Sequence, residues 1–117
     1  GYELARSIGC NFMFYERSGE QFELRRGFSI KEQANVLFVE DVITTGKSTN
    51  ECLEKLNQMN INLLGIAAIV DRSNEVLFDN FQIISLLKID IPVYDSDNLP
   101  DDLEKIKPIK PGSRIIQ

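Results

Sequence analysis

The stretch Val36-Leu37-Phe38-Val39-Glu40-Asp41-Val42-Ile43-Thr44-Thr45-Gly46-Lys47-Ser48-Thr49 decides the fold of this chain. Its apolar start, rich in β-branched and aromatic residues, predicts a buried strand over Val36–Val39. Two adjacent carboxylates, Glu40 and Asp41, follow at the C-terminal end of that strand. A short hydroxyl-rich loop then leads into a helix. Ligands of open α/β sheets bind at the C-terminal ends of the strands, so the stretch predicts a ligand site.

The loop has the chemistry of a phosphate site. A helix N-terminus presents backbone N–H groups to an anion, and Gly46 lets the backbone approach closely. The hydroxyls of Thr44, Thr45, Ser48 and Thr49 add donors. The adjacent carboxylates suit sugar hydroxyls or a hard cation such as Mg²⁺, and a phosphorylated ribose would use both. The alternative is a purely structural turn in which Ser48 or Thr49 caps the helix.

The run Gly46-Lys47-Ser48 also invites comparison with the P-loop of nucleoside triphosphatases. That motif needs a second glycine five positions before Gly46, where this sequence has Asp41. An acid inside a loop that wraps polyphosphate is electrostatically unfavourable, so the P-loop reading is disfavoured.

The rest of the chain predicts an α/β fold, a mostly parallel sheet with flanking helices. The predicted helix Thr49–Asn60 would bury one face formed by Cys52, Leu53, Leu56 and Met59. With the strands on either side of it, this helix makes a βαβ unit. Further strands are expected over Asn11–Tyr15, Leu63–Val70 and Phe81–Leu87. Short helices are expected over Ser73–Asp79 and Leu99–Ile106, a hairpin arm or mobile loop over Gln21–Phe28, and an extended tail over Lys107–Gln117.

Length and composition narrow the class. With 117 residues and 43% hydrophobic residues, one packed domain is expected. Gly1–Gly9 reads as a helix already under way, from which we expect residues 1–117 to be a core domain that lacks an N-terminal segment.

The longest apolar run is too short for a membrane span. A net charge of −5 without a basic run argues against a general nucleic-acid surface. Cys10 and Cys52 suggest reduced thiols in a cytoplasmic protein, and without histidine there is no His-based metal or nucleophile site.

The run from Glu40 to Thr49, placed after an apolar strand, resembles the motif of the type I phosphoribosyltransferases that binds 5-phosphoribosyl 1-diphosphate (PRPP). The resemblance implies that Glu40 and Asp41 bracket the ribose 2′ and 3′ hydroxyls and that Thr44–Ser48 wrap the 5′-phosphate. It also implies Mg²⁺ as cofactor, carried by PRPP and near Glu40 and Asp41. The PRPP-binding residues implied in this way are Arg17, Glu40, Asp41, Val42, Ile43, Thr44, Thr45, Gly46, Lys47 and Ser48.

Other segments are similar to the orotate branch of that family. They are Phe14-Tyr15-Glu16-Arg17, Leu24-Arg25-Arg26-Gly27-Phe28, Ile69-Val70-Asp71-Arg72, Lys110-Pro111-Gly112-Ser113-Arg114 and the opening Gly1-Tyr2-Glu3-Leu4-Ala5-Arg6. The resemblance implies an Mg²⁺-dependent enzyme of pyrimidine biosynthesis that makes orotidine 5′-monophosphate from PRPP and orotate, and a homodimer for the full-length enzyme.

Two arginines and the acid pair receive roles from this resemblance. Arg72, at a strand end, would bind the orotate carboxylate together with Thr44; the alternative is a surface arginine paired with Asp71 or Glu75. Arg17, at the end of the strand Asn11–Tyr15, would contact the diphosphate and act in catalysis with Asp41 and Glu40.

The family's catalytic loop is longer and contains Lys and His, whereas Ser18–Phe22 is short and has neither. Arg25 and Arg26 are therefore the candidates for loop contacts, and a solvated hairpin is the alternative. Two other functions stay open: a purine base as acceptor, for which Arg72 would be dispensable, and a regulator that senses PRPP or nucleotides without turnover.

Overall fold

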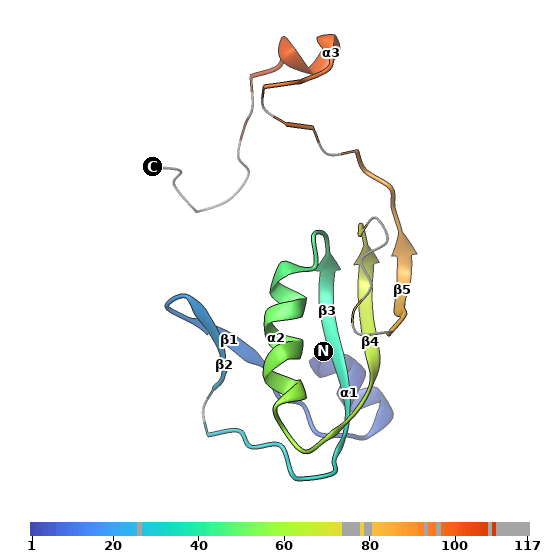
Figure 1. Ribbon diagram of the computed structural model, residues 1–117. Coiled ribbons are helices and arrows are strands. Elements are labelled where there is room, and N and C mark those ends of the chain that lie inside the picture. Colours follow the sequence, from blue (N-terminus) through green and yellow to red (C-terminus); the bar gives the residue numbers. More distant parts are fainter. Residues whose placement is uncertain are drawn as a thin grey trace.

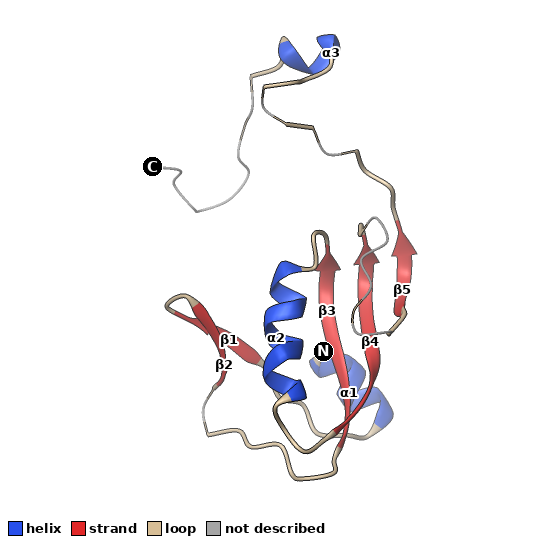
Figure 2. Cartoon of the chain, viewed as in Figure 1, coloured by secondary structure: helices blue, strands red, loops and turns tan. Residues whose placement is uncertain are grey.

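The computed structural model describes residues 1–25, 27–73, 78, 81–92, 94–95, 97–107 and 109. Its helices are α1 (Tyr2–Ile8), α2 (Lys47–Asn57) and α3 (Asp101–Glu104). Its strands are β1 (Tyr15–Ser18), β2 (Gln21–Leu24), β3 (Asn35–Ile43), β4 (Asn62–Asp71) and β5 (Ile83–Lys88). Figure 1 shows their arrangement, and Figure 2 shows the same view by type of element.

The centre of the fold is a parallel sheet of three strands in the order β3-β4-β5. Helix α2 carries the chain from the end of β3 back to the start of β4 and lies beside these strands (Figure 1). The pairing places Phe38 opposite Ile66 and Ile66 opposite Ile83, so one face of the sheet is apolar across all its strands. The predicted βαβ unit and α/β class are confirmed. β3 is longer than predicted and continues through Glu40 and Asp41 to Ile43.

The core forms where α2 packs on that sheet face. Ile66 is completely buried, and Leu53, Leu56 and Ile43 are almost as inaccessible. The buried residues of α2 are Thr49, Cys52, Leu53 and Leu56, which recur at helical spacing. The prediction of this face was right for Cys52, Leu53 and Leu56 but wrong for Met59. The helix ends at Asn57, and Met59 lies in the exposed turn beyond it.

The prediction of a sheet strand over Asn11–Tyr15 was wrong. Tyr15 instead begins β1, which pairs antiparallel with β2 in a separate hairpin that packs against α2. A strand needs a neighbour, and no described strand lies beside Asn11–Phe14. The aromatic rings of this segment pack locally: Phe12 stacks on Phe14 at 6.0 Å, and Phe14 meets Phe28 edge-on at 5.5 Å. For Gln21–Phe28, the hairpin alternative holds through Leu24.

The two ends of the chain follow the predictions in part. α1 ends at Gly9, which adopts the left-handed conformation of a helix C-cap. β5 begins at Ile83 inside the predicted strand Phe81–Leu87, and α3 lies within the predicted helix Leu99–Ile106 after Pro100. Figure 1 shows α3 apart from the sheet. The predicted helix Ser73–Asp79 and the tail Lys107–Gln117 fall mostly outside the described residues. In the described part, no helix is long and apolar enough to span a membrane.

Replacing Leu56 with alanine tests the packing of α2 on the sheet. We expect Leu56→Ala to lower the free energy of unfolding by about 2–5 kcal/mol, because it leaves a cavity in the core. Urea unfolding followed by circular dichroism measures the change. Glu54→Ala on the exposed side of the same helix is the control, expected within about 0.5 kcal/mol of the parent. Equal losses for the two variants would contradict this core.

Candidate functional site

The acid pair lies in the last part of β3. Glu40 is half-buried and Asp41 is exposed. The Val42 N–H donates to Asp41 Oδ1 at 2.7 Å, which fixes the Asp41 carboxylate at the strand end. Burial raises the pKa of Glu40, and a hydrogen bond to Asp41 and the charge of Asp41 raise it further. Hydrogen bonds from hydroxyl groups, or a bound cation, reduce the repulsion between two such carboxylates.

The turn between β3 and α2 is held at both ends. Ile43, 1% exposed, anchors the end of β3 in the core. Gly46 is the N-cap of α2, with φ at 72°, in the left-handed region that favours glycine. Because the N-cap is Gly46, which has no side chain, the alternative of a cap by Ser48 or Thr49 is not found in the described residues. Thr45 Oγ1 accepts a long hydrogen bond of 3.5 Å from the Lys47 N–H.

The hydroxyl groups of this turn divide into two sets. Thr44, Thr45 and Ser48 are exposed beside the first turn of α2. Thr49 is only 1% exposed, so its predicted place in the phosphate cradle was wrong. It precedes Cys52 and Leu53 by three and four residues and therefore faces the core with them. The N-terminus of α2 and the exposed hydroxyls together form a surface suited to an anion.

Arg72 follows the last residue of β4 and lies at the same edge of the sheet. Its backbone N–H donates to the Ile43 carbonyl at 2.8 Å, which ties the turn after β4 to the residue before Thr44. Arg72 and Thr44, the two residues that the resemblance assigns to orotate, therefore follow neighbouring strand ends. Arg72 Nε is buried and has no hydrogen-bond partner among the described residues. That unused donor suits an acceptor group on a ligand.

Asp71 is not a partner of Arg72 in the described residues; it organises the turn beside it. Its Oδ1 accepts hydrogen bonds from the Ser73 N–H at 2.8 Å and from Ser73 Oγ at 2.6 Å. Lys88 Nζ lies 3.8 Å from Oδ2. Burial alone would raise the pKa of Asp71, but the Ser73 hydrogen bonds and the charge of Lys88 outweigh it and hold that pKa below its usual value. The other surface alternative for Arg72 involves Glu75, which lies outside the described residues.

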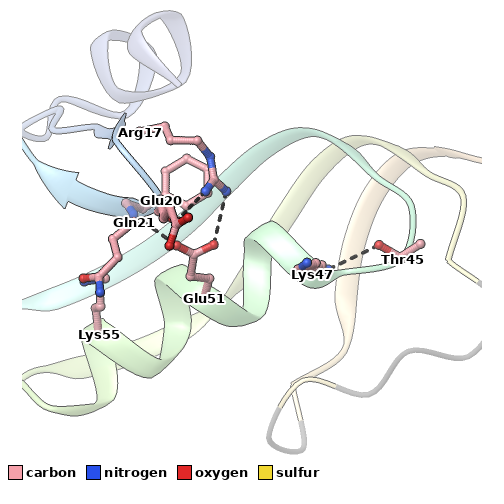
Figure 3. A network of polar contacts seen from close by, with 8 residues as sticks. Arg17, Glu20, Gln21, Thr45, Lys47, Glu51 and Lys55 are labelled. Atoms are coloured by element: carbon pink, nitrogen blue, oxygen red, sulfur yellow. Dashed lines mark hydrogen bonds and ion pairs between the residues drawn. The ribbon is translucent and has the colours of Figure 1, made fainter. Parts of the chain in front are cut away.

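Arg17 lies in β1 of the hairpin, not at the end of a sheet strand as predicted. Figure 3 shows its guanidinium over α2. Nη2 donates to Glu51 Oε2 at 3.2 Å, Nη1 donates to the Glu20 carbonyl at 2.7 Å, and the group lies 4.2 Å from the centre of the Phe22 ring. Arg25 pairs with Glu16 at 2.7 Å, and both side chains are partly exposed, as in the solvated hairpin alternative. Arg26 lies outside the described residues.

A cavity of about 760 Å³ lies between the hairpin, the sheet and α2. Tyr15 and Phe22 line it from the hairpin, Glu40 from β3, and Ser48 and Cys52 from α2, among others. Burial, followed by the charges of Glu40 and Glu51, raises the pKa of the Cys52 thiol to about 11. One member of the acid pair and one hydroxyl of the phosphate turn therefore share a cavity with the hairpin.

The sequence reasoning missed Glu51, which accepts hydrogen bonds from both Arg17 and the Phe22 N–H. The spacing of Glu51 from the phosphate turn could have indicated part of this role. Glu51 comes three residues after Ser48, and residues at this spacing are neighbours on a helix. Its partners on the hairpin lie 34 and 29 residues away in sequence, and nothing local indicates them.

The carboxylates of the site fit a cation that arrives with a phosphate ligand. No group of three or more His, Cys, Asp or Glu side chains in the described part of the chain forms a ready metal cage. Mg²⁺ is commonly held by one or two carboxylates together with substrate phosphates. Glu40 and Asp41 provide that number of ligands beside the candidate phosphate turn.

The site thus joins an acid pair on a parallel strand, a left-handed glycine turn and a helix N-terminus within one βαβ unit of an α/β domain. No protein-family model matches the chain. The chain is 43% identical over 117 residues to the orotate phosphoribosyltransferase of Phenylobacterium zucineum, a match that covers 100% of this chain and 60% of the relative. It is 41% identical over 114 residues to that of Maricaulis maris, covering 97% and 59%. With that of Methylorubrum populi, 44% of 117 residues are identical, covering 99% and 60%.

The chain is therefore homologous over its whole length to the orotate phosphoribosyltransferases. It spans about 60% of the length of these relatives.

Asp71→Asn tests the buried carboxylate beside Arg72. Because folding lowers the pKa of Asp71, its charge stabilises the fold above the unfolded pKa of about 3.9 and is lost as the pH falls through the folded pKa. We expect Asp71→Asn to cost about 1–3 kcal/mol at pH 7 and progressively less below about pH 4. Urea unfolding across pH 3–7 measures this dependence. Asp90→Asn, an exposed position with the same charge change, should show no such loss. A cost at Asp71 that stays constant with pH would refute the assignment.

Proposed function

We propose that this chain provides the PRPP and orotate contacts of an orotate phosphoribosyltransferase. The reaction transfers the phosphoribosyl group of PRPP to N1 of orotate, giving orotidine 5′-monophosphate and diphosphate in pyrimidine biosynthesis. The proposal rests on one observation: the strand that carries Glu40 and Asp41 leads directly through the Gly46 turn into the N-terminus of α2. The names of the relatives, matched along the whole chain, support orotate as the acceptor.

PRPP binding follows from the two halves of the motif. The 5′-phosphate lies against Thr44–Ser48, where the N-terminus of α2 and exposed hydroxyls meet an anion. Glu40 and Asp41 accept hydrogen bonds from the ribose 2′ and 3′ hydroxyls. The raised pKa of Glu40 agrees with a carboxylate held ready for hydroxyl donors.

The acceptor base lies against the C-terminal ends of β3 and β4. Orotate carries a carboxylate, which a guanidinium binds through two parallel hydrogen bonds. Arg72 is tied to Ile43 by its backbone and has an unused buried Nε–H. A purine base has no carboxylate, so a role of the Arg72 guanidinium in binding the acceptor would favour orotate.

The chemistry breaks the bond from the ribose C1 to the diphosphate oxygen, which leaves with the electron pair. A bond forms from C1 to N1 of orotate, and the N1 proton is released to the diphosphate or to solvent. Negative charge develops on the leaving diphosphate, and positive charge develops on the ribose as in an oxocarbenium ion. Arg17 stabilises the departing diphosphate, and Asp41 and Glu40 hold the ribose in place. Mg²⁺ bound with PRPP would supply further charge neutralisation. No covalent nucleophile is required.

The proposal extends to the whole protein. Residues 1–117 form one phosphoribosyltransferase core domain, the enzyme is a homodimer, and it acts in the cytoplasm. The homology along the whole chain supports the first of these statements.

Neutralising the acid pair tests the PRPP site. We expect Asp41→Asn combined with Glu40→Gln to lower turnover at least about a thousandfold, because the ribose contacts are lost from the transition state. The fold should remain, since an asparagine oxygen can still accept the Val42 N–H. Turnover is measured as orotidine 5′-monophosphate formation in the natural polypeptide that contains this chain, and thermal melting checks the fold. Glu54→Gln on the exposed side of α2 is the control. Near-normal turnover of the folded double variant would refute the proposal.

Replacing Arg72 tests the acceptor. We expect Arg72→Ala to raise the KM for orotate about tenfold or more, because a charged hydrogen bond is lost, and to change the KM for PRPP by less than about threefold. Arg72→Lys keeps the charge but loses the two-pronged geometry, so an intermediate effect is expected. Steady-state kinetics with each substrate varied in turn gives both constants. Equal effects on the two substrates would argue against a base-binding role.

A further inference from the structure

Glu51 joins the hairpin to α2 at one carboxylate. Oε1 accepts the Phe22 N–H at 3.1 Å, and Oε2 accepts Arg17 Nη2 at 3.2 Å (Figure 3). The Glu51 side chain is 25% exposed and that of Arg17 is 46% exposed. A carboxylate with a donor on each oxygen fixes both the hairpin backbone and the direction of the guanidinium.

The position of Glu51 on α2 places this contact close to the phosphate turn. Ser48 and Glu51 are three residues apart, so their Cβ atoms lie about 5–6 Å from each other on the helix surface. The charges of Glu40, Glu51 and Arg17 all act on the Cys52 thiol, which lines the same cavity as Glu40 and Ser48. Because it is bound to Glu51, the Arg17 guanidinium is held about one helical turn from the candidate phosphate turn.

Two further contacts limit where the guanidinium can go. Nη1 is bound to the Glu20 carbonyl, and the flat face of the group lies over the Phe22 ring. A guanidinium has five N–H donors, and the Glu51 and Glu20 contacts occupy one on each terminal nitrogen. Donors remain for a ligand without release of the Glu51 contact.

We propose that Glu51 is a positioning residue that holds the Arg17 guanidinium beside the first turn of α2, in place for the diphosphate of PRPP. This inference rests on the function proposed above. Glu51 itself does not touch the substrate. It acts through Arg17, so its effect on PRPP depends on the presence of Arg17.

A double-mutant cycle in the natural polypeptide that contains this chain tests the inference. We expect Glu51→Ala to raise the KM for PRPP about fivefold or more and the KM for orotate less than about twofold. In an Arg17→Ala background, the same substitution should change the KM for PRPP less than about twofold, because the group that Glu51 positions is gone. Glu51→Gln keeps one acceptor oxygen and should recover part of the loss.

The control is Gln21→Ala, which removes another hydrogen bond between the hairpin and α2, from Lys55 Nζ to Gln21 Oε1 at 3.3 Å. It leaves every charge in place, and the KM for PRPP should stay within about twofold of the parent. A Gln21→Ala effect as large as that of Glu51→Ala would mean that hairpin docking in general, and not Arg17, is responsible.

The outcomes separate this inference from the function on which it rests. Additive effects of Glu51→Ala and Arg17→Ala, or a silent Arg17→Ala, would overturn the inference while turnover of the parent upholds the function. A parent without turnover would overturn the proposed function, and the same cycle is then measured by calorimetry with inorganic diphosphate and Mg²⁺. Non-additive losses of diphosphate affinity would support the positioning role, and additive losses or no binding would overturn it.

Discussion

The turn from β3 into α2 is the constraint on which the rest of the site depends. Ile43 is buried in the core and Gly46 is buried in the left-handed conformation, so only Thr44 and Thr45 lie exposed between them. A residue with a Cβ atom at Gly46 would be strained by about 1–2 kcal/mol in this conformation. The burial of Ile43 and the geometry of Gly46 together fix the direction of α2 relative to β3. The acid pair and the helix N-terminus therefore keep one relative position.

The chain binds an anion, in the proposed function, despite a net charge of −5. The attraction comes from local groups: the N-terminus of α2, Arg72 at the sheet edge and Arg17 on the hairpin. Two of the nearby carboxylates are already paired with other groups of the protein. Asp71 is bound to Ser73 and Lys88, and Glu51 is bound to the hairpin. Acids that are already paired repel a ligand less than free ones, because their charge is partly balanced.

The parts of the structure that the sequence predicted are those set by local pattern. The βαβ unit follows from apolar periodicity, and the end of α1 at Gly9 follows from a glycine signal. The errors concern residues whose state depends on distant partners. Asn11–Phe14 has the composition of a strand, but no strand of the described residues lies beside it. Thr49 has a hydroxyl suited to a phosphate site but faces the core. The contact between Glu51 and Arg17 joins segments 34 residues apart. No local pattern encodes that distance.

The two arginines of the site are held in different ways, and this difference bears on mechanism. Arg72 follows a central strand, and a backbone hydrogen bond to β3 fixes its main chain. Arg17 lies on a hairpin outside the sheet, and its half-exposed ion pair with Glu51 contributes about 0–1 kcal/mol. The Glu20 carbonyl and the Phe22 ring contact the same guanidinium, so several weak contacts together orient it. In the proposed function, the base would meet a strand end fixed by its backbone, and the diphosphate would meet a guanidinium already oriented by the hairpin and α2.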